Sequence, residues 1–152
     1  MSIKVSIDAS GGDFGFPVTI NAGINALKAY DDLLVNFVGD QTGIEKELKN
    51  NALSSKFLSR IEITHASEVI NMDDSPSVAL RHKKDSSMRV AINLVKNGEA
   101  DACVSAGNTG ALMSIARFVL KTISGVDRPA IMSAVPTPVS YTHLTLPTIL
   151  LV

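Results

Sequence analysis

The sequence predicts an α/β fold, a mostly parallel sheet with helices on both faces. Short runs of β-branched residues alternate with longer segments of helical period, which is the pattern of strands joined by helical crossovers. The length of 152 residues fits one domain, and an apolar fraction of 45% is enough for a buried core. Glycine-rich turns follow two of the strands, where such sheets carry their loops.

The first half of the chain predicts three strands and two helices. The strands are expected at residues 3–7, 33–38 and 61–64, and the helices from about 17 and over about 42–49. Pro17 suits the first turn of a helix, because the N–H that proline lacks would be unpaired there. Ile20, Ile24 and Leu27 follow at helical spacing and are expected to form the buried stripe of this helix.

The second half begins with another helix start at Pro76 and continues with the clearest helix of the chain, over residues 86–98. Ser86 or Asp85 can cap its start and Gly98 can end it. Its core-facing residues are expected to be Met88, Ala91, Ile92 and Val95. A fourth strand is expected at 102–105, then a helix that buries Leu112, Ile115, Ala116, Val119 and Ile123, then a fifth strand at 130–135.

Residues 138–152 break this pattern. They contain two prolines, no glycine and no charged residue, and they end in an apolar run. They show neither helical period nor turn chemistry, and they resemble a translated sequencing adapter joined to a truncated reading frame. We therefore expect residues 138–152 to be a non-native tail and leave them out of the fold prediction.

Composition excludes several classes of function. With 14 basic and 15 acidic residues the chain has a net charge of -1, so no overall field favours nucleic acid. Cys103 is the only cysteine, which fits a reducing cytosol and, within an apolar strand, a small core residue rather than a nucleophile. The histidines show no metal-ligand spacing, so no metal site is expected. No signal peptide or membrane-spanning segment is recognised.

Two glycine-rich turns are the candidate ligand sites. The second, Ser-Ala-Gly-Asn-Thr-Gly at 105–110, joins a strand to a helix whose first N–H groups are unpaired. Ser105, Asn108 and Thr109 add side-chain hydrogen-bond groups, which favours a phosphate site. The alternative is a structural turn in which Asn108 or Thr109 only caps the helix. Neither GxxxxGK[ST] nor GxGxxG is present, so nucleotide binding is not indicated.

The first turn, Asp-Ala-Ser-Gly-Gly-Asp at 8–13, carries two glycines between two carboxylates. Paired glycines let a backbone approach a ligand closely. Asp8 and Asp13 could then bind a cation, orient a donor or accept a proton. The alternative is that both aspartates form the turn and cap the following helix.

The main basic cluster is Arg81-His82-Lys83-Lys84, with Arg89 in the next helix. Such a run usually forms a solvated face. Alternatively, it binds an anionic substrate or an acidic protein partner. Arg128, at the entrance to the fifth strand, is a separate candidate cation.

Five motifs, in order, resemble those of the phosphate acyltransferase family. They are residues 8–15, 74–76, 81–89, 105–112 and 125–130. Ser10 stands where that family usually has methionine. The resemblance covers residues 1–137, which would be the N-terminal α/β part, about two-fifths, of a family member.

The resemblance implies a doubly wound fold, similar to that of isocitrate-type dehydrogenases and truncated here. It also implies transfer of a fatty acyl group from acyl carrier protein to inorganic phosphate, forming acyl phosphate for phospholipid synthesis. The implied enzyme is cytoplasmic, a homodimer at full length, peripherally attached to the membrane, and needs no metal or nucleotide. Two alternatives remain: a phosphotransacetylase-like enzyme that uses acyl-CoA, and a non-catalytic phosphate-binding domain.

This reaction requires phosphate to be held and aimed at a thioester carbonyl, whose developing oxyanion is stabilised. The predicted phosphate ligands are Ser105, Gly107, Asn108, Thr109 and Gly110, with Arg128 or Lys84 as charge partner. The predicted catalytic residues are Asp8, Asp13 and Asn108. The predicted contacts to the carrier protein or substrate are Arg81, His82, Lys83, Lys84 and Arg89. Because the chain lacks more than half of such an enzyme, we expect it to be inactive alone.

Overall fold

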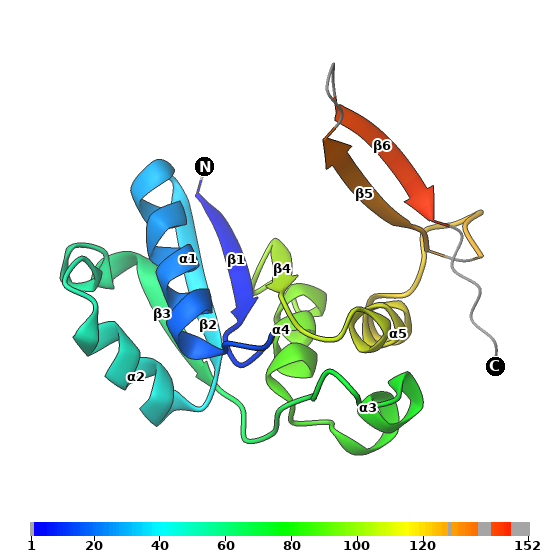
Figure 1. Cartoon of the computed structure of the whole chain (residues 1–152), viewed down its shortest axis with the longest axis horizontal. Coiled ribbons are helices and arrows are strands. Elements are labelled where there is room, and N and C mark those ends of the chain that lie inside the picture. The colour runs from blue at the N-terminus through cyan, green and yellow to red at the C-terminus, as the bar shows by residue number, and fades with distance from the viewer. Residues whose placement is uncertain (1, 128, 137–140, 147–152) are drawn as a thin grey trace. The chain divides into compact units, whose positions relative to one another are not determined.

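The computed structural model describes residues 2–127, 129–136 and 141–146, and the chain divides into two units, Met1–Leu120 and Lys121–Val152. The first unit is a four-stranded sheet flanked by helices, and the second contains a two-stranded sheet (Figure 1). Among the described residues, no helix is both long and apolar enough to cross a membrane.

The first unit confirms the predicted α/β class. Its strands are β1 (Ile3–Asp8), β2 (Leu33–Gly39), β3 (Ile61–His65) and β4 (Ala102–Ser105), all parallel and in the order β3-β2-β1-β4. Its helices are α1 (Phe16–Ala29), α2 (Gln41–Asn50), α3 (Pro76–His82), α4 (Ser87–Lys96) and α5 (Thr109–Leu120), with short 3-10 turns η1 (Ser54–Lys56) and η2 (Leu58–Arg60).

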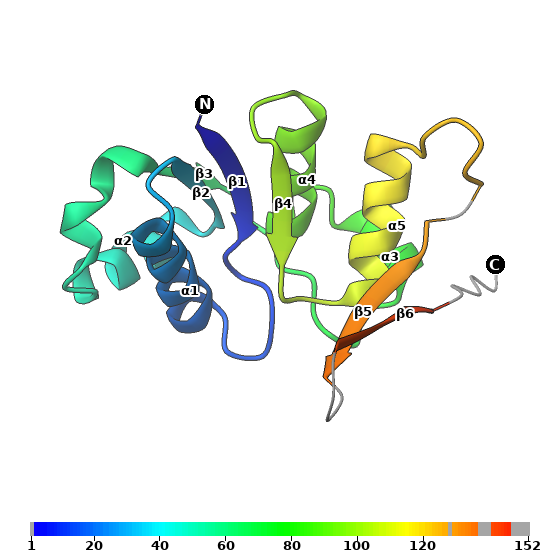
Figure 2. The same cartoon turned by 90° about the horizontal axis from the view of Figure 1, so that it is seen from above.

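Helices cover the two faces of this sheet. The predicted stripe of α1 is buried and packs with Val35 and Phe37 of β2 in one core cluster. On the opposite face, the Ser6 hydroxyl in β1 donates to the carbonyl of Ala91 in α4 at 3.0 Å. Figure 2 shows α1 and α4 on opposite sides of the strands. The sheet is therefore a middle layer between two layers of helices.

Local sequence signals account for most helix ends. Pro17 lies in the first turn of α1, and the Ser86 hydroxyl caps α4, so the cap is Ser86 and not Asp85. Gly98 follows α4 with φ +75°, a conformation that glycine adopts without strain. In α4, Leu94 is buried, whereas the expected core residue Val95 is only partly buried.

The prediction for Ile123 was wrong. Helix α5 ends at Leu120, and Lys121 adopts a left-handed φ of +68°, which turns the chain out of the helix. Ile123 lies beyond this turn and is 78% exposed. The helical spacing of apolar residues therefore continued past the actual end of the helix.

The second unit contains β5 (Ile131–Pro136) and β6 (Tyr141–Leu146), which pair antiparallel with Ile131 opposite Leu146. The predicted fifth strand is confirmed, with its bounds shifted by one residue. Its partner was not foreseen, because residues 138–152 were left out of the fold prediction. Residues 138–140 and 147–152 of that segment lie outside the described residues.

Candidate functional site

The two glycine-rich turns pack against each other. The parallel register places Asp8 beside Ser105, so both turns leave the sheet at the same edge. A Cβ atom on Gly11 would lie 2.6 Å from the Asp8 carboxylate and 3.1 Å from the Gly107 nitrogen. Gly12 has a φ of +86°, and a Cβ there would lie 3.2 Å from the Ala106 carbonyl oxygen. The paired glycines thus permit close approach of the neighbouring turn.

Asp8 is buried behind these turns and fixes two serines. It is 2% exposed, and its carboxylate accepts hydrogen bonds from the hydroxyls of Ser87 at 2.6 Å and Ser105 at 2.7 Å. The Ser105 oxygen in turn accepts the backbone N–H of Gly107 at 3.0 Å. Asp8 therefore links the end of β1 to the start of α4 and to the 105–110 turn.

Ser87 belongs to this arrangement although no sequence motif predicts its role. Ser87 is 1% exposed in the first turn of α4, and its hydroxyl donates to the Asp8 carboxylate. The one available signal was a second serine directly after a helix cap.

Asp13 is separated from Asp8 and is exposed on the loop that leads to α1. The residue at the N-cap of α1 is Gly15, with φ 56°, and no side chain caps the helix. The alternative in which the two aspartates cap this helix is therefore wrong. Asp13 remains available at the rim of the paired turns.

The start of α5 presents two backbone donors. The Asn108 side-chain oxygen accepts the N–H of Ala111 at 3.0 Å, which makes Asn108 the cap of this helix. Within the described residues, the backbone N–H groups of Thr109 and Gly110 have no hydrogen-bond acceptor, and both residues are exposed. With the positive end of the helix dipole, they form a local anion-binding feature.

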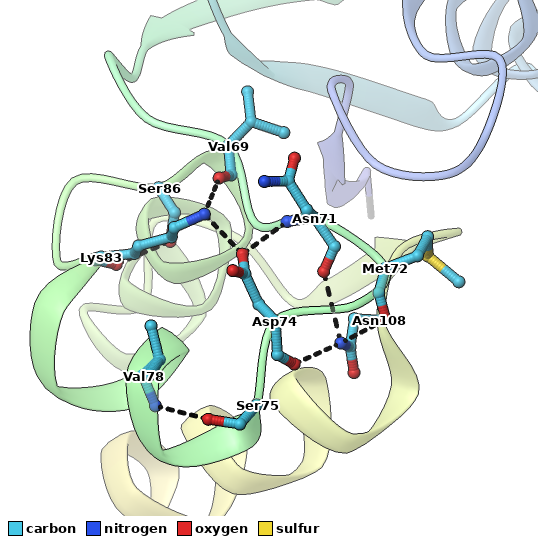
Figure 3. A network of polar contacts seen from close by, with 9 residues as sticks. All are labelled: Val69, Asn71, Met72, Asp74, Ser75, Val78, Lys83, Ser86 and Asn108. Atoms are coloured by element: carbon cyan, nitrogen blue, oxygen red, sulfur yellow. Dashed lines mark hydrogen bonds and ion pairs between the residues drawn. The ribbon is translucent and has the colours of Figure 1, made fainter.

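The Asn108 amide group is used inside the protein. Its nitrogen donates to the carbonyls of Asn71 at 3.3 Å, Met72 at 3.0 Å and Asp74 at 2.9 Å (Figure 3). Its oxygen serves the cap. The alternative in which Asn108 caps the helix is therefore confirmed. If Asn108 also binds phosphate, as predicted, it would have to do so with its backbone N–H.

An ion pair fixes the loop that contains Asn71, Met72 and Asp74. Lys83 donates to the carbonyl of Val69 at 2.8 Å and pairs with the Asp74 carboxylate, which also accepts the N–H of Asn71 at 2.7 Å (Figure 3). The hydrogen bond from Lys83 and then that from Asn71 lower the pKa of Asp74. Lys83 is therefore engaged in the protein's own structure.

The predicted basic cluster does not present a uniform surface. Arg81, His82 and Lys84 are exposed, whereas Arg89 is partly buried with its guanidinium 5.4 Å from the ring centre of Phe118. Such a geometry is a cation–π contact. Arg128 lies outside the described residues, so its predicted role stays a prediction.

Two other groups titrate away from their usual range. Asp85 accepts the hydroxyl of Ser67 at 2.5 Å and its N–H at 3.0 Å, and these bonds lower the pKa of Asp85. Burial raises the pKa of the Cys103 thiol to about 11. A thiol of this kind is protonated at neutral pH, which agrees with the core role expected for Cys103.

Comparison with known proteins gives the same family throughout. Residues 3–147 match the protein family described as "Fatty acid synthesis protein", a range that reaches into the segment 138–152. The phosphate acyltransferase of Ruthia magnifica subsp. Calyptogena magnifica is 64% identical over 144 residues, which are 95% of this chain and 42% of that protein. The phosphate acyltransferase of Hydrogenovibrio crunogenus is 51% identical, with the same two coverages of 95% and 42%. The chain thus spans about two-fifths of the length of these relatives.

Proposed function

Because this chain belongs to the fatty acid synthesis protein family, we propose that it forms the N-terminal part of a phosphate acyltransferase. The whole enzyme transfers a fatty acyl group from acyl carrier protein to inorganic phosphate. The product is an acyl phosphate, an activated precursor for phospholipid synthesis. As the resemblance implies, the proposed full-length enzyme is a cytoplasmic homodimer in peripheral contact with the membrane and uses no metal or nucleotide.

The observation that carries this proposal is the pair of interlocked turns beside the start of α5. The N–H groups of Thr109 and Gly110 point to an anion of phosphate size, because they are exposed and make no hydrogen bond within the described part of the chain. The Thr109 hydroxyl adds a donor. Lys84, which is exposed, or Arg128 would supply the positive charge.

In the proposed reaction, Asp8 is a positioning residue. Its buried carboxylate accepts the hydroxyl hydrogens of Ser87 and Ser105, so it acts on phosphate by fixing the 105–110 turn rather than by contact. One phosphate oxygen forms a bond to the thioester carbonyl carbon while the carbon–sulfur bond breaks. The carrier sulfur takes up the proton that hydrogen phosphate loses and leaves as a thiol. Asp13, at the rim of the turns, is the candidate group to orient the phosphate.

The exposed part of the basic cluster is proposed to dock the acidic carrier protein. Opposite charges raise the rate of encounter and depend on ionic strength. Changing Arg81 and His82, both exposed, to glutamate together should raise the KM for the acylated carrier several-fold and leave kcat nearly unchanged. Lys28→Glu, on α1, is the matched control. An unchanged KM in the double variant would exclude this surface.

The activity is tested in a chimeric enzyme. Residues 1–137 of this chain would replace the matching part of the Ruthia magnifica relative, and acyl phosphate would be trapped with hydroxylamine as an acyl hydroxamate. We expect hydroxamate from acyl carrier protein with phosphate, and none from the 152-residue chain alone. Activity only with acyl-CoA would favour the phosphotransacetylase alternative. Phosphate binding without hydroxamate would favour a non-catalytic domain.

A further inference from the structure

An apolar groove of about 390 Å³ lies in the first unit, between α1 and the strands β1 and β4. Its volume is within the range of small-molecule sites. Val18, Ala22 and Tyr30 form the helical wall, and Val5, Ile7 and Val104 form the strand wall. The groove is therefore a hydrophobic channel on the surface of this unit.

The alternation of side chains along the strands explains why this groove is apolar. Ser6, Asp8 and Ser105 point to the face that carries α4, as their hydrogen bonds show. Their neighbours in the strands, Ile7 and Val104, must then point to the face that carries α1. Helix α1 packs mainly on β1 and β2, and Val104 remains 53% exposed.

One end of the groove reaches the proposed phosphate site. Asp8 and Ala106, which belong to the two interlocked turns, are part of its lining, and Tyr30 lies at the opposite end of α1. Three lining residues have polar side chains. Thr19 donates to the carbonyl of Ala9 at 2.8 Å and Asp8 accepts from its serines, whereas Tyr30 lies at the far end of α1. Between Tyr30 and the turns, the groove therefore offers no unpaired side chain for a polar ligand.

We propose that this groove binds the fatty acyl chain of the thioester substrate, an inference that rests on the proposed function. Such a chain is apolar and extended, and its reacting carbonyl must lie beside the bound phosphate. Along α1, the wall from Val18 to Tyr30 is roughly 18 Å long at 1.5 Å per residue. One end of the groove lies at the paired turns. An acyl chain bound in the groove would therefore place its carbonyl beside the bound phosphate.

The test uses the 152-residue chain and alkylphosphonates, which join a phosphate-like head to an alkyl chain. Methyl-, butyl-, octyl- and dodecylphosphonate, below their aggregation limits, would be titrated by NMR with inorganic phosphate as the reference. All five probes should shift the amides of Thr109 and Gly110. Only the longer chains should also shift the methyl groups of Val18 and Val104. Affinity should rise about fourfold per added methylene until the groove is filled.

Variants that fill the groove from two different walls make the test specific. Ala22→Phe on α1 and Val104→Phe on β4 should each weaken dodecylphosphonate binding about tenfold or more, since the aromatic ring displaces several methylenes. Their response to inorganic phosphate should not change. Ala29→Phe, an exposed residue of α1 that does not line the groove, is the matched control. If one of the two groove variants misfolds, its NMR spectrum will show this, and the other variant then decides whether the groove binds the alkyl chain.

The outcomes separate this inference from the proposed function. If Thr109 and Gly110 respond to phosphate but the groove methyls ignore every alkyl chain, the acyl-chain site is wrong and the phosphate site stands. If the methyls respond while those amides ignore phosphate, the proposed function is what fails. Self-association of the chain abolished by Val104→Phe, without any probe, would identify the groove as an interface between copies and overturn the inference.

Discussion

At the scale of single residues, Asp8 acts through its neighbours. A buried carboxylate is costly unless its oxygens accept hydrogen bonds, and Ser87 and Ser105 provide them. The absence of a side chain on Gly11 lets the first turn close over this carboxylate. The residues that fix the site are therefore distinct from those proposed to touch phosphate.

Gly11→Ala should destabilise the first unit by about 1–3 kcal/mol, because its Cβ would overlap the Asp8 carboxylate. Urea unfolding would measure the loss. In a double-mutant cycle with Asp8→Ala, the two losses should not be additive, since the second change removes the atoms that clash. Gly98→Ala, with nothing within 4 Å of its Cβ, should show only the backbone cost of its positive φ. Additive losses would contradict the contact.

Cys103 should resist alkylation in the folded chain. With a pKa of about 11, its reactive thiolate at pH 8 should be scarcer than that of an unfolded cysteine by on the order of a hundredfold. Iodoacetamide labelling followed by mass spectrometry would compare the native chain with the chain in urea. Equal rates in both would show that the thiol is not buried.

Asp74 should make the first unit sensitive to acid. Lys83 and the Asn71 N–H lower its pKa from 3.8 in the folded state, so its contribution is complete above that unfolded value. The contribution is lost as the pH falls through the lower, folded value. Asp74→Asn should flatten the dependence of the unfolding free energy on pH below about 4. Asp73→Asn, the exposed neighbour, is the control, and equal curves for both variants would contradict the ion pair.

At the scale of elements, Asn108 joins a helix start to a distant loop. Its oxygen caps α5, and its nitrogen donates to the carbonyls of Asn71, Met72 and Asp74. The ion pair between Lys83 and Asp74 fixes the same loop from its other side. The loop between β3 and α3 is therefore held beside the 105–110 turn without contributing a regular element.

Asn108→Asp and Asn108→Ala separate these two functions. The aspartate keeps an oxygen for the cap but loses the amide donors, so it should release the loop and preserve α5. The alanine loses both and should cost about 1 kcal/mol more, the usual value of a helix cap. Hydrogen exchange at residues 71–74 and at Ala111 would report the loop and the helix. Equal protection at Ala111 in both variants would contradict the capping role.

The elements were largely predictable because their signals are local. The apolar stripes of α1, α4 and α5 and the side-chain caps of α4 and α5 are each formed by residues close together in the sequence. The site was less predictable because its contacts join distant segments: Ser87 and Asp8 are 79 residues apart, and Asn108 and Asp74 are 34 apart. A run of basic residues indicates a charged face, but it does not tell which cation pairs internally. Glycine pairs likewise indicate close approach without showing what approaches.

At the scale of the whole molecule, the first unit holds both glycine-rich turns, and the described residues of the second include the β5–β6 hairpin. We propose that residues 138–152 are a non-native tail and that the enzyme's activity needs the part of the relatives that this chain does not cover. A chain ending at residue 137 should therefore unfold in urea with the same midpoint as the 152-residue chain. A clearly lower midpoint would show that the tail is integral to the fold.

The central claim is that the 105–110 turn binds phosphate, and NMR titration of the 152-residue chain with inorganic phosphate tests it most directly. We predict saturable shifts of the Thr109 and Gly110 amides, absent with chloride at equal ionic strength. Asp8→Asn should weaken them, because Ser105 would lose its charged acceptor. Shifts confined to the exposed Arg81 and Lys84, or no saturable shift at all, would contradict the claim.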